Sequence, residues 1–189
     1  MLKVAITGNI SSGKSAVKNI LDELHYKTLC LDEVTEFLYN NSTALKSKLK
    51  NEFNSDNKSE IAKFIFDDNK KLKTLENIIY PFIKDEMFAF FSENNKEKII
   101  FVVAPMLFES GFNKYFDKII FVSSDVNIRL DRLIKRNNYS KSYALKRINS
   151  QFPESEKIKK ADYVIENNSD LDTLCKNTIK TIKCLSTLL

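Results

Sequence analysis

The chain has 189 residues, 43% of them hydrophobic, and its 30 lysines and arginines against 25 acidic residues give a net charge of +5. This length suits one α/β domain with modest insertions, and no apolar run approaches the ~20 residues of a membrane span. Three scattered cysteines and one histidine predict neither a disulfide framework nor a zinc site. Lysines and acids are interspersed, so the small positive excess does not predict a nucleic-acid partner. The N-terminal apolar stretch is too short for a signal peptide, and we expect a reduced, cytoplasmic protein with no membrane partner.

The N-terminus carries a strand, a loop and a helix in the order that a phosphate-binding motif requires. Residues 2–7 (LKVAIT) are mostly apolar and β-branched, as in a buried parallel strand. Residues 8–15 (GNISSGKS) match the pattern G-x-x-x-x-G-K-S and hold two of the three glycines in the chain. Apolar residues then recur at helical spacing from Val17 to Leu24. We therefore expect the loop amides and the helix N-terminus to surround nucleotide phosphates.

Each position of this phosphate loop has an expected task. Lys14 is expected to reach the β- and γ-phosphates of ATP, and the Ser15 hydroxyl to ligate Mg²⁺. The alternative, a plain turn between a strand and a helix, requires the whole motif to arise by chance. The residues of this segment expected to bind ATP are Gly8, Asn9, Ile10, Ser11, Ser12, Gly13, Lys14, Ser15 and Ala16.

A second strand is predicted over residues 27–31, and Asp32 follows it directly. Ligands of parallel α/β folds bind beyond the carboxyl ends of the strands, which favours Asp32 as a site residue. A carboxylate at that place can accept the proton of an attacking hydroxyl group. The alternative role is to cap a helix that begins at Glu33.

A helical insertion is predicted over residues 36–97, because no convincing strand lies between Asp32 and the next predicted strand. Apolar residues recur at helical spacing over 61–83, with aromatic residues continuing beyond, and residues 51–60 (NEFNSDNKSE) are typical of a polar connecting loop. We expect most of its aromatic side chains to lie in the core, namely Phe64, Phe82, Phe88 and Phe91.

Three more strands follow, and an amphipathic helix over residues 171–189 is expected to close the fold. Because each strand is followed by helical or loop sequence, the sheet should be mostly parallel and doubly wound. The expected fold class is α/β, a P-loop NTPase-type five-stranded sheet with a helical substrate-binding insertion and a lid. The three later strands are predicted over 98–103, 118–122 and 162–165, and the nucleotide-binding core over 1–35, 98–136 and 158–189.

All four arginines of the chain lie in one 19-residue window. In the predicted helix 126–136, an apolar face formed by Val126, Leu130, Leu133 and Ile134 stands apart from the arginines. The planar guanidinium fork is not replaceable by lysine, which favours a phosphate-binding role. The alternative is that these arginines lie on a solvated helix face. We favour that alternative for Arg129, and the phosphate-binding role for Arg132 and Arg136. The polar, basic segment 137–157 is expected to form a mobile lid that carries Arg147.

The chain lacks the marks of several other P-loop classes. No acid stands three residues before a glycine, so the D-x-x-G motif of GTPase switches is absent, and so is the guanine motif N-K-x-D. Small-molecule kinases remain, in which an insertion binds the acceptor and an arginine-bearing lid closes over the transferred phosphoryl group.

The motifs taken together resemble the dephospho-CoA kinase family. They cover nearly the whole chain in the family's order: GNISSGKS (8–15), LCLDEV (29–34), PMLFES (105–110), RLDRLIKRNN (129–138), KRINSQ (146–151) and KKADYVIENN (159–168). The resemblance implies ATP-dependent phosphorylation of the ribose 3′-hydroxyl of dephospho-CoA, the last step of CoA synthesis. It implies a general base at Asp32, phosphate and magnesium contacts from Lys14 and Ser15, a phosphate clamp of Arg136 and Arg147, and an adenine-side position for Asn167. The catalytic residues would then be Asp32, Lys14, Arg136 and Arg147, in a protein expected to be a monomer with oligomerisation left open.

The chain also departs from the family's pattern. Asn9 and Ser11 replace two loop glycines and are expected to point outward, and an acid triplet is reduced to Cys30-Leu31-Asp32. A His-Pro pair becomes Tyr80-Pro81, and Ala104 replaces an acid before the PMLFE turn, which leaves Glu109 as an acid near magnesium or as a structural group. Two alternatives therefore stay open: another P-loop kinase for a nucleoside, nucleotide or small alcohol, or an ATP-binding regulatory protein or inactive paralogue.

Overall fold

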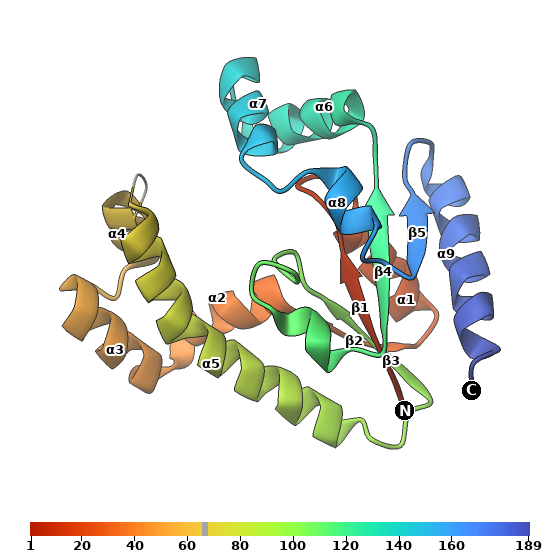
Figure 1. Cartoon of the computed structure of the whole chain (residues 1–189), viewed down its shortest axis with the longest axis horizontal. Coiled ribbons are helices and arrows are strands. Elements are labelled where there is room, and N and C mark those ends of the chain that lie inside the picture. Colours follow the sequence, from red (N-terminus) through yellow and green to blue (C-terminus); the bar gives the residue numbers. More distant parts are fainter. Residues whose placement is uncertain (66–67) are drawn as a thin grey trace. The chain divides into compact units, whose positions relative to one another are not determined.

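A five-stranded sheet forms the centre of the fold in the computed structural model, which describes residues 1–65 and 68–189 (Figure 1). The strand order is β2-β3-β1-β4-β5, and β1 runs parallel to β3 and β4, as β4 does to β5. Each strand begins and ends within one residue of its predicted range, so the predicted α/β class is confirmed. The strands are β1 (Leu2–Thr7), β2 (Lys27–Cys30), β3 (Ile99–Val103), β4 (Lys118–Ser123) and β5 (Tyr163–Glu166).

The strand order decides where a ligand site can form. The inner strands β1, β3 and β4 are near-continuous apolar runs because both of their faces are buried; every residue of β3 is buried. In this order, β2 and β3 lie on one side of β1, and β4 and β5 lie on the other. The strand order therefore reverses at β1. That switch point is the usual ligand position in such sheets, and the phosphate loop begins there.

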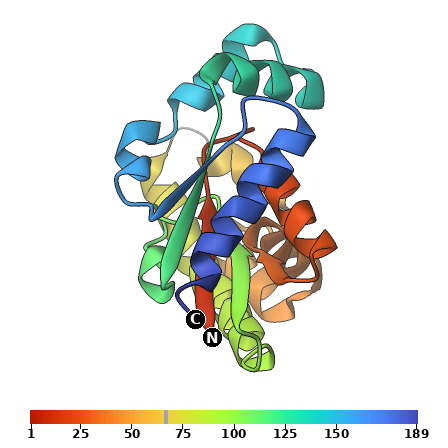
Figure 2. The same ribbon diagram turned by 90° about the vertical axis from the view of Figure 1, so that its right-hand side faces the viewer.

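The chain divides into two compact units, residues 1–28 with 96–189 and residues 29–95. In the first unit, α9 packs against β5 and α1 (Figure 2). Its predicted amphipathic character is confirmed, because Leu174, Ile182 and Leu185 are buried. The helices of this unit are α1 (Lys14–Glu23), the 3₁₀ helix η1 (Phe112–Tyr115), α6 (Val126–Asn137), α7 (Lys141–Asn149), α8 (Glu154–Ile158) and α9 (Leu171–Ser186).

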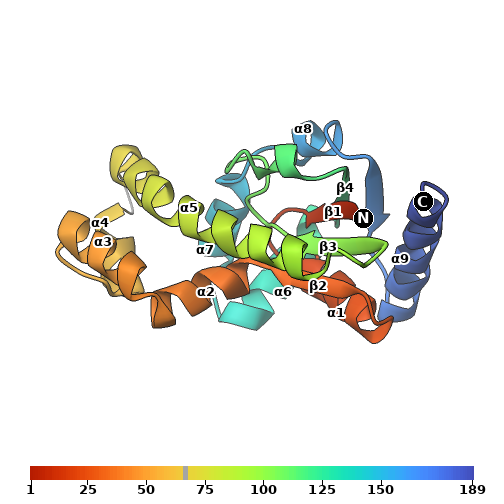
Figure 3. The same cartoon turned by 90° about the horizontal axis from the view of Figure 1, so that it is seen from below.

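The second unit is helical, as predicted for the insertion, and its long helix α5 contacts each of the other three (Figure 3). The described residues of this unit after β2 contain no strand, and residues 66 and 67 of the expected insertion lie outside them. The expected loop 51–60 is wrong in extent, because the helices before and after it continue to Phe53 and from Lys58. Phe53 is buried and extends the apolar side of its helix. The helices are α2 (Leu31–Asn41), α3 (Thr43–Phe53), α4 (Lys58–Ile65) and α5 (Asn69–Glu93).

The lengths and compositions of the helices indicate whether any of them could cross a membrane. Over the described ranges 1–65 and 68–189, none of the helices combines the length and the apolar character that crossing a bilayer requires.

Candidate active site

The carboxyl ends of three neighbouring strands supply the candidate site in the first unit. β1 ends at Thr7 and leads into the phosphate loop, β4 leads into Ser124, and β5 leads into Asn167. The backbone N–H of Asn167 donates to the Ser123 carbonyl at 2.8 Å, which continues the pairing of β4 and β5 past the strand ends. Polar groups from three distant parts of the sequence therefore meet at one sheet edge.

The phosphate loop has the form expected for binding phosphates. α1 begins at Lys14, directly after Gly13, so the amides at its N-terminus and its dipole favour an anion. The Lys14 Nζ donates to the carbonyl oxygens of Gly8 and Asn9, at 2.9 and 3.0 Å. The ammonium group thus lies across the mouth of the loop, in the place from which it can turn to phosphate oxygens.

Two of the glycines are required by close approach. A Cβ at Gly8 would lie 2.4 Å from the Val122 carbonyl oxygen, and a Cβ at Gly13 would lie 1.9 Å from the Asn167 Nδ2. Gly13 also has φ +105°, a conformation that side chains rarely adopt. Glycine is therefore required at both positions, by a backbone carbonyl oxygen beside Gly8 and by the Asn167 side chain beside Gly13.

Asn167 braces the back of the phosphate loop. Its Nδ2 donates to the Ser12 carbonyl at 2.7 Å, and only 6% of the residue is exposed. The Arg132 Nη2 donates to both the main-chain oxygen and the Oδ1 of Asn167, each at 3.2 Å. The predicted site residue Asn167 and Arg132 of the arginine cluster therefore form one network with the loop.

The two loop residues that replace family glycines do not point outward, so that expectation is wrong. Asn9 is 4% exposed, and the Ser11 Oγ is buried although its backbone has φ +60°. Among the described atoms, neither the Asn9 Oδ1 nor the Ser11 Oγ has a hydrogen-bond partner. Asn9 lines the cavity that the loop shares with the segment after α7.

The interpretation of Arg129 as a solvated residue is also wrong. Its side chain is 4% exposed, its Nη2 lies 3.2 Å from the Glu154 Oε2, and its Nε donates to the Ser124 carbonyl at 2.9 Å. A guanidinium can be buried when a carboxylate and a carbonyl oxygen satisfy it. Conversely, Val126 of the predicted apolar face is 46% exposed, so the buried side of α6 is rotated toward Arg129.

The expected lid segment packs against the phosphate loop at one point. Leu130 and Leu133 of α6 form a buried cluster with Ala144 and Ile148 of α7, and Ile10 of the loop packs against it. The Gln151 Oε1 accepts a hydrogen bond from the Ile10 backbone N–H at 2.7 Å. These contacts connect positions about 140 residues apart in the sequence.

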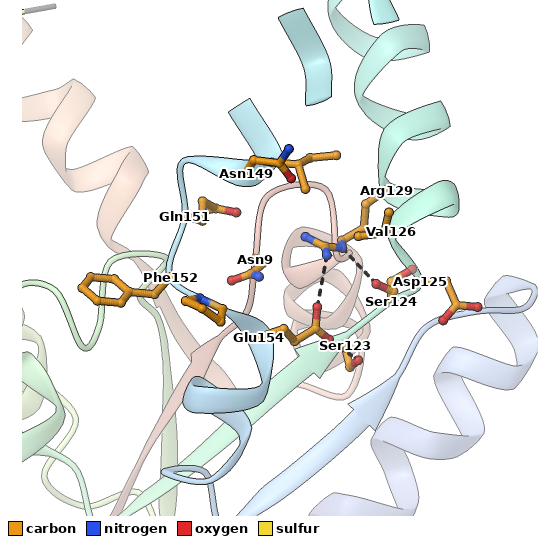
Figure 4. A pocket seen from close by; sticks show the side chains of 12 residues that line it. Asn9, Ser123, Ser124, Asp125, Val126, Arg129, Asn149, Gln151, Phe152 and Glu154 are labelled. Carbon is orange, nitrogen blue, oxygen red and sulfur yellow. Dashed lines mark hydrogen bonds and ion pairs between the residues drawn. The ribbon is translucent and has the colours of Figure 1, made fainter. Parts of the chain in front are cut away.

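A cavity of about 600 Å³ lies between the loop, the end of β4 and the segment after α7 (Figure 4). Arg129 extends into the middle of this view and bonds Glu154 on one side and Ser124 on the other. The Arg129 Nη1 has no hydrogen-bond partner in the described part of the chain. The lining comprises Asn9, Ser123, Ser124, Asp125, Val126, Arg129, Ile148, Asn149, Gln151, Phe152, Pro153 and Glu154.

Glu109 has a structural partner. Its Oε1 lies 2.6 Å from the Nζ of Lys157 on α8, and the two side chains are only 12% and 3% exposed. Glu154, three residues before Lys157, pairs with Arg129 and also bonds Ser123. Two ion pairs, that of Lys157 largely buried and that of Glu154 partly exposed, thus tie α8 to the turn after β3 and to α6. Of the two roles left open for Glu109, this contact favours the structural one.

Four other predicted site residues are exposed, namely Ser15, Asp32, Arg136 and Arg147. Ser15 lies in the first turn of α1, while the Arg136 Nε donates to the neighbouring Asn137 Oδ1 at 2.9 Å and Arg147 lies on α7. Asp32 belongs to the second unit and lies in the first turn of α2, which begins at Leu31. It is therefore not the cap of a helix starting at Glu33.

Beside Asp32, burial raises the pKa of the Cys30 thiol, against weaker opposing hydrogen bonds from the backbone of Glu33 and Asp32. The thiol therefore stays protonated at neutral pH. Within residues 1–65 and 68–189, no three His, Cys, Asp or Glu side chains are grouped so that they could hold a metal ion. A metal in the loop would depend on the Ser15 hydroxyl and on the phosphates of the ligand.

Gln151 was assigned no role from the sequence, and Arg132 was expected to bind phosphate as one of the clustered arginines, whereas here it holds Asn167. Both stand in recognisable segments, KRINSQ and the arginine-rich helix, and both contact the phosphate loop or its brace. The arginine cluster was a usable signal for Arg132. Nothing local in the sequence indicates Gln151, because its partner is a backbone amide far away in the chain.

Comparison with known proteins is consistent with this site. A family model described as dephospho-CoA kinase matches residues 2–173. A dephospho-CoA kinase of Fusobacterium nucleatum is 33% identical over 180 residues, covering 92% of this chain and 93% of that protein. The dephospho-CoA kinase of Rickettsia typhi is 34% identical over 187 residues, 98% of each chain.

Solved structures give the same picture. A Thermus thermophilus protein matches with a TM-score of 0.83 and 28% identity, over 100% of this chain and 98% of the other. A dephospho-CoA kinase from Campylobacter jejuni matches with a TM-score of 0.70 and 25% identity, over 98% and 97%. A shikimate kinase from Aquifex aeolicus, with a TM-score of 0.53 and 14% identity over 98% of both chains, shares the fold. Because the family model spans most of the chain and relatives above 30% identity span nearly all of it, the chain belongs to the dephospho-CoA kinase family.

Proposed function

We propose that this protein transfers the γ-phosphoryl group of ATP to the ribose 3′-hydroxyl of dephospho-CoA and so forms CoA. The observation that carries the proposal is a braced phosphate loop at the switch point of the sheet, in a chain that matches the family along its length. Phosphoryl transfer asks a protein mainly to position its substrates and to stabilise negative charge. A loop closed by Lys14 and braced by Asn167 supports both tasks.

ATP would bind with its phosphates in the loop 8–15. Lys14 would exchange its two carbonyl contacts for phosphate oxygens, and the amides at the start of α1 would bind the β-phosphate. Mg²⁺, which the exposed Ser15 hydroxyl can reach, would neutralise charge on the β- and γ-phosphates when bound. The adenine would lie on the Asn167 side of the loop, where Asn167 acts through its brace to Ser12.

Asp32 would remove the proton of the acceptor hydroxyl. It is exposed in the first turn of α2, so its carboxylate is open to a substrate. A carboxylate within reach of the acceptor hydroxyl can accept its proton as the oxygen attacks phosphorus. The helical insertion 36–97 would hold the rest of the acceptor.

Arg136 and Arg147 would clamp the transferred phosphoryl group. Both are exposed cations, on the last turn of α6 and on α7, and an arginine fork suits the planar spread of charge in the transition state. Replacing either should lower kcat more than it weakens ATP binding. A variant that changed ATP affinity alone would contradict the clamp.

The decisive experiment measures ADP release with ATP and dephospho-CoA, and locates the new phosphate on the product by mass spectrometry and ³¹P NMR. The expected product carries one further phosphate at the ribose 3′ position, formed in equal amount with ADP. A Lys14→Met protein purified in the same way controls for contaminating kinases. Phosphorylation of a nucleoside, nucleotide or small alcohol instead would support another P-loop kinase, and ATP binding without turnover of any acceptor would support a regulatory protein.

A further inference from the structure

Gln151 makes a contact that joins the expected lid segment to the phosphate loop. Its Oε1 accepts the Ile10 backbone N–H at 2.7 Å, across 141 positions of sequence. Because the Ile10 amide donates to Gln151, it cannot donate to a phosphate at the same time, and phosphate binding is left to the other amides of the loop and to Lys14. The contact instead acts on the conformation of the loop. We propose that Gln151 is a positioning residue, which holds the phosphate loop in its nucleotide-binding conformation.

The loop needs such support at this place. Ser11, the residue after Ile10, has φ +60°, a left-handed conformation that is unfavourable for a residue with a side chain. The net free energy that one hydrogen bond contributes to stability is similar in size to the free-energy cost of one residue in the left-handed conformation. A bond at Ile10 can therefore decide whether this part of the loop keeps its strained shape before ATP binds.

Gln151 is itself held from both sides. Before it, α7 is fixed by the apolar cluster that it shares with α6 and with the Ile10 side chain. After it, α8 is fixed by the ion pairs of Glu154 with Arg129 and of Lys157 with Glu109. A side chain carried between two anchored helices can hold a loop with little loss of conformational entropy.

The inference rests on the nucleotide-binding part of the proposed function and does not depend on the acceptor. Its test compares Gln151→Met, which keeps the length but cannot accept a hydrogen bond, with Gln151→Glu, which retains an acceptor oxygen. In the protein without nucleotide, Gln151→Met should speed hydrogen exchange at the Ile10 amide by about tenfold or more, whereas Gln151→Glu should keep that amide protected.

Nucleotide affinity provides the second measurement. Loss of one net hydrogen bond predicts about five- to tenfold weaker ADP binding for Gln151→Met by calorimetry. The KM for dephospho-CoA should not move. Ser150→Ala is the matched control, because Ser150 is the exposed neighbour of Gln151 and does not line the cavity, and it should leave both the exchange at Ile10 and the ADP affinity unchanged.

Several results would overturn the inference. These are unchanged Ile10 exchange in Gln151→Met, a lower melting temperature with unchanged ADP affinity, or an equal loss of affinity in Ser150→Ala. Failure to phosphorylate dephospho-CoA would count against the proposed function alone, since neither amide exchange nor ADP binding involves the acceptor.

Discussion

Gly13 and Gly111 both have positive φ, at +105° and +70°, but their surroundings differ. A Cβ at Gly13 would meet the Asn167 Nδ2 at 1.9 Å, whereas a Cβ at Gly111 has no described atom within 4 Å. Gly13→Ala should therefore displace Asn167 from the Ser12 carbonyl and weaken ADP binding by at least about tenfold, since a buried amide group loses its partner. Calorimetric titration with ADP measures this effect.

Gly111→Ala is the matched control for backbone strain. It places a side chain in a left-handed conformation with open space around it, so unfolding free energy should fall by about 1–2 kcal/mol while ADP affinity stays constant. Equal losses of affinity in the two variants would show that strain, and not the contact with Asn167, limits substitution at Gly13.

Asp32 can be tested against its own neighbour. Asp32→Asn removes the proposed base and should lower kcat by about 10²- to 10⁴-fold, with a smaller change in the KM for ATP. Glu33→Gln removes the same charge from the same first turn of α2, so both variants lose the same favourable interaction with the helix dipole. Steady-state kinetics that gave equal rates for the two variants would reduce Asp32 to a helix-stabilising residue.

At the scale of elements, α8 has only five residues and cannot be stable by its own hydrogen bonds. Its position depends on two ion pairs: Glu154 is the anion of one, which is partly exposed, and Lys157 is the cation of the other, which is largely buried. Breaking a buried pair leaves one charge without compensation, whereas replacing both partners by apolar groups removes the penalty. The effects of single and double substitutions in such a pair on the free energy of unfolding are therefore expected to be strongly non-additive.

Chemical denaturation can measure that coupling. Lys157→Met should lower the free energy of unfolding by about 3–5 kcal/mol, and the double variant Lys157→Met with Glu109→Leu should recover most of the loss. Lys159→Met, at the residue that caps the C-terminus of α8, is the control, because Lys159 and its partner Glu156 are 69% and 55% exposed. Exposed pairs contribute about 0–1 kcal/mol. A double variant as unstable as the single one would mean that the buried pair does not act as a unit.

At the scale of the whole molecule, the elements were more predictable than the contacts between them. Strand limits and the phosphate loop follow from local periodicity and spacing, so the sheet and the loop were recognisable in the sequence. The burial of Asn9 and of Arg129 could not be predicted in this way, because the residues beside them come from the segment after α7. That segment is more than 20 residues away from either side chain in the sequence. The Gln151 contact with Ile10 has no local signature for the same reason.

The division into two units predicts separate footprints for the two substrates. ADP should slow hydrogen exchange in the loop 8–16 and around Asn167, in the first unit. Dephospho-CoA alone should slow exchange in the second unit, where three large aromatic side chains are exposed and available to an apolar chain. Asp32, the proposed base, belongs to that unit as well. The exposed side chains are Phe37 at 56%, Phe64 at 52% and Phe88 at 45%, a correction to the expectation that Phe64 and Phe88 lie in the core.

Hydrogen exchange with each substrate alone, read by mass spectrometry on peptides from both units, tests this assignment. The Gly13→Ala protein is the control, since it should lose the protection given by ADP and keep the protection given by dephospho-CoA. Because the base must touch the acceptor hydroxyl, protection should include the peptide that contains Asp32. If dephospho-CoA protected only the first unit, the helical insertion would not be the acceptor-binding part, and Asp32 would lose its place beside the reacting hydroxyl.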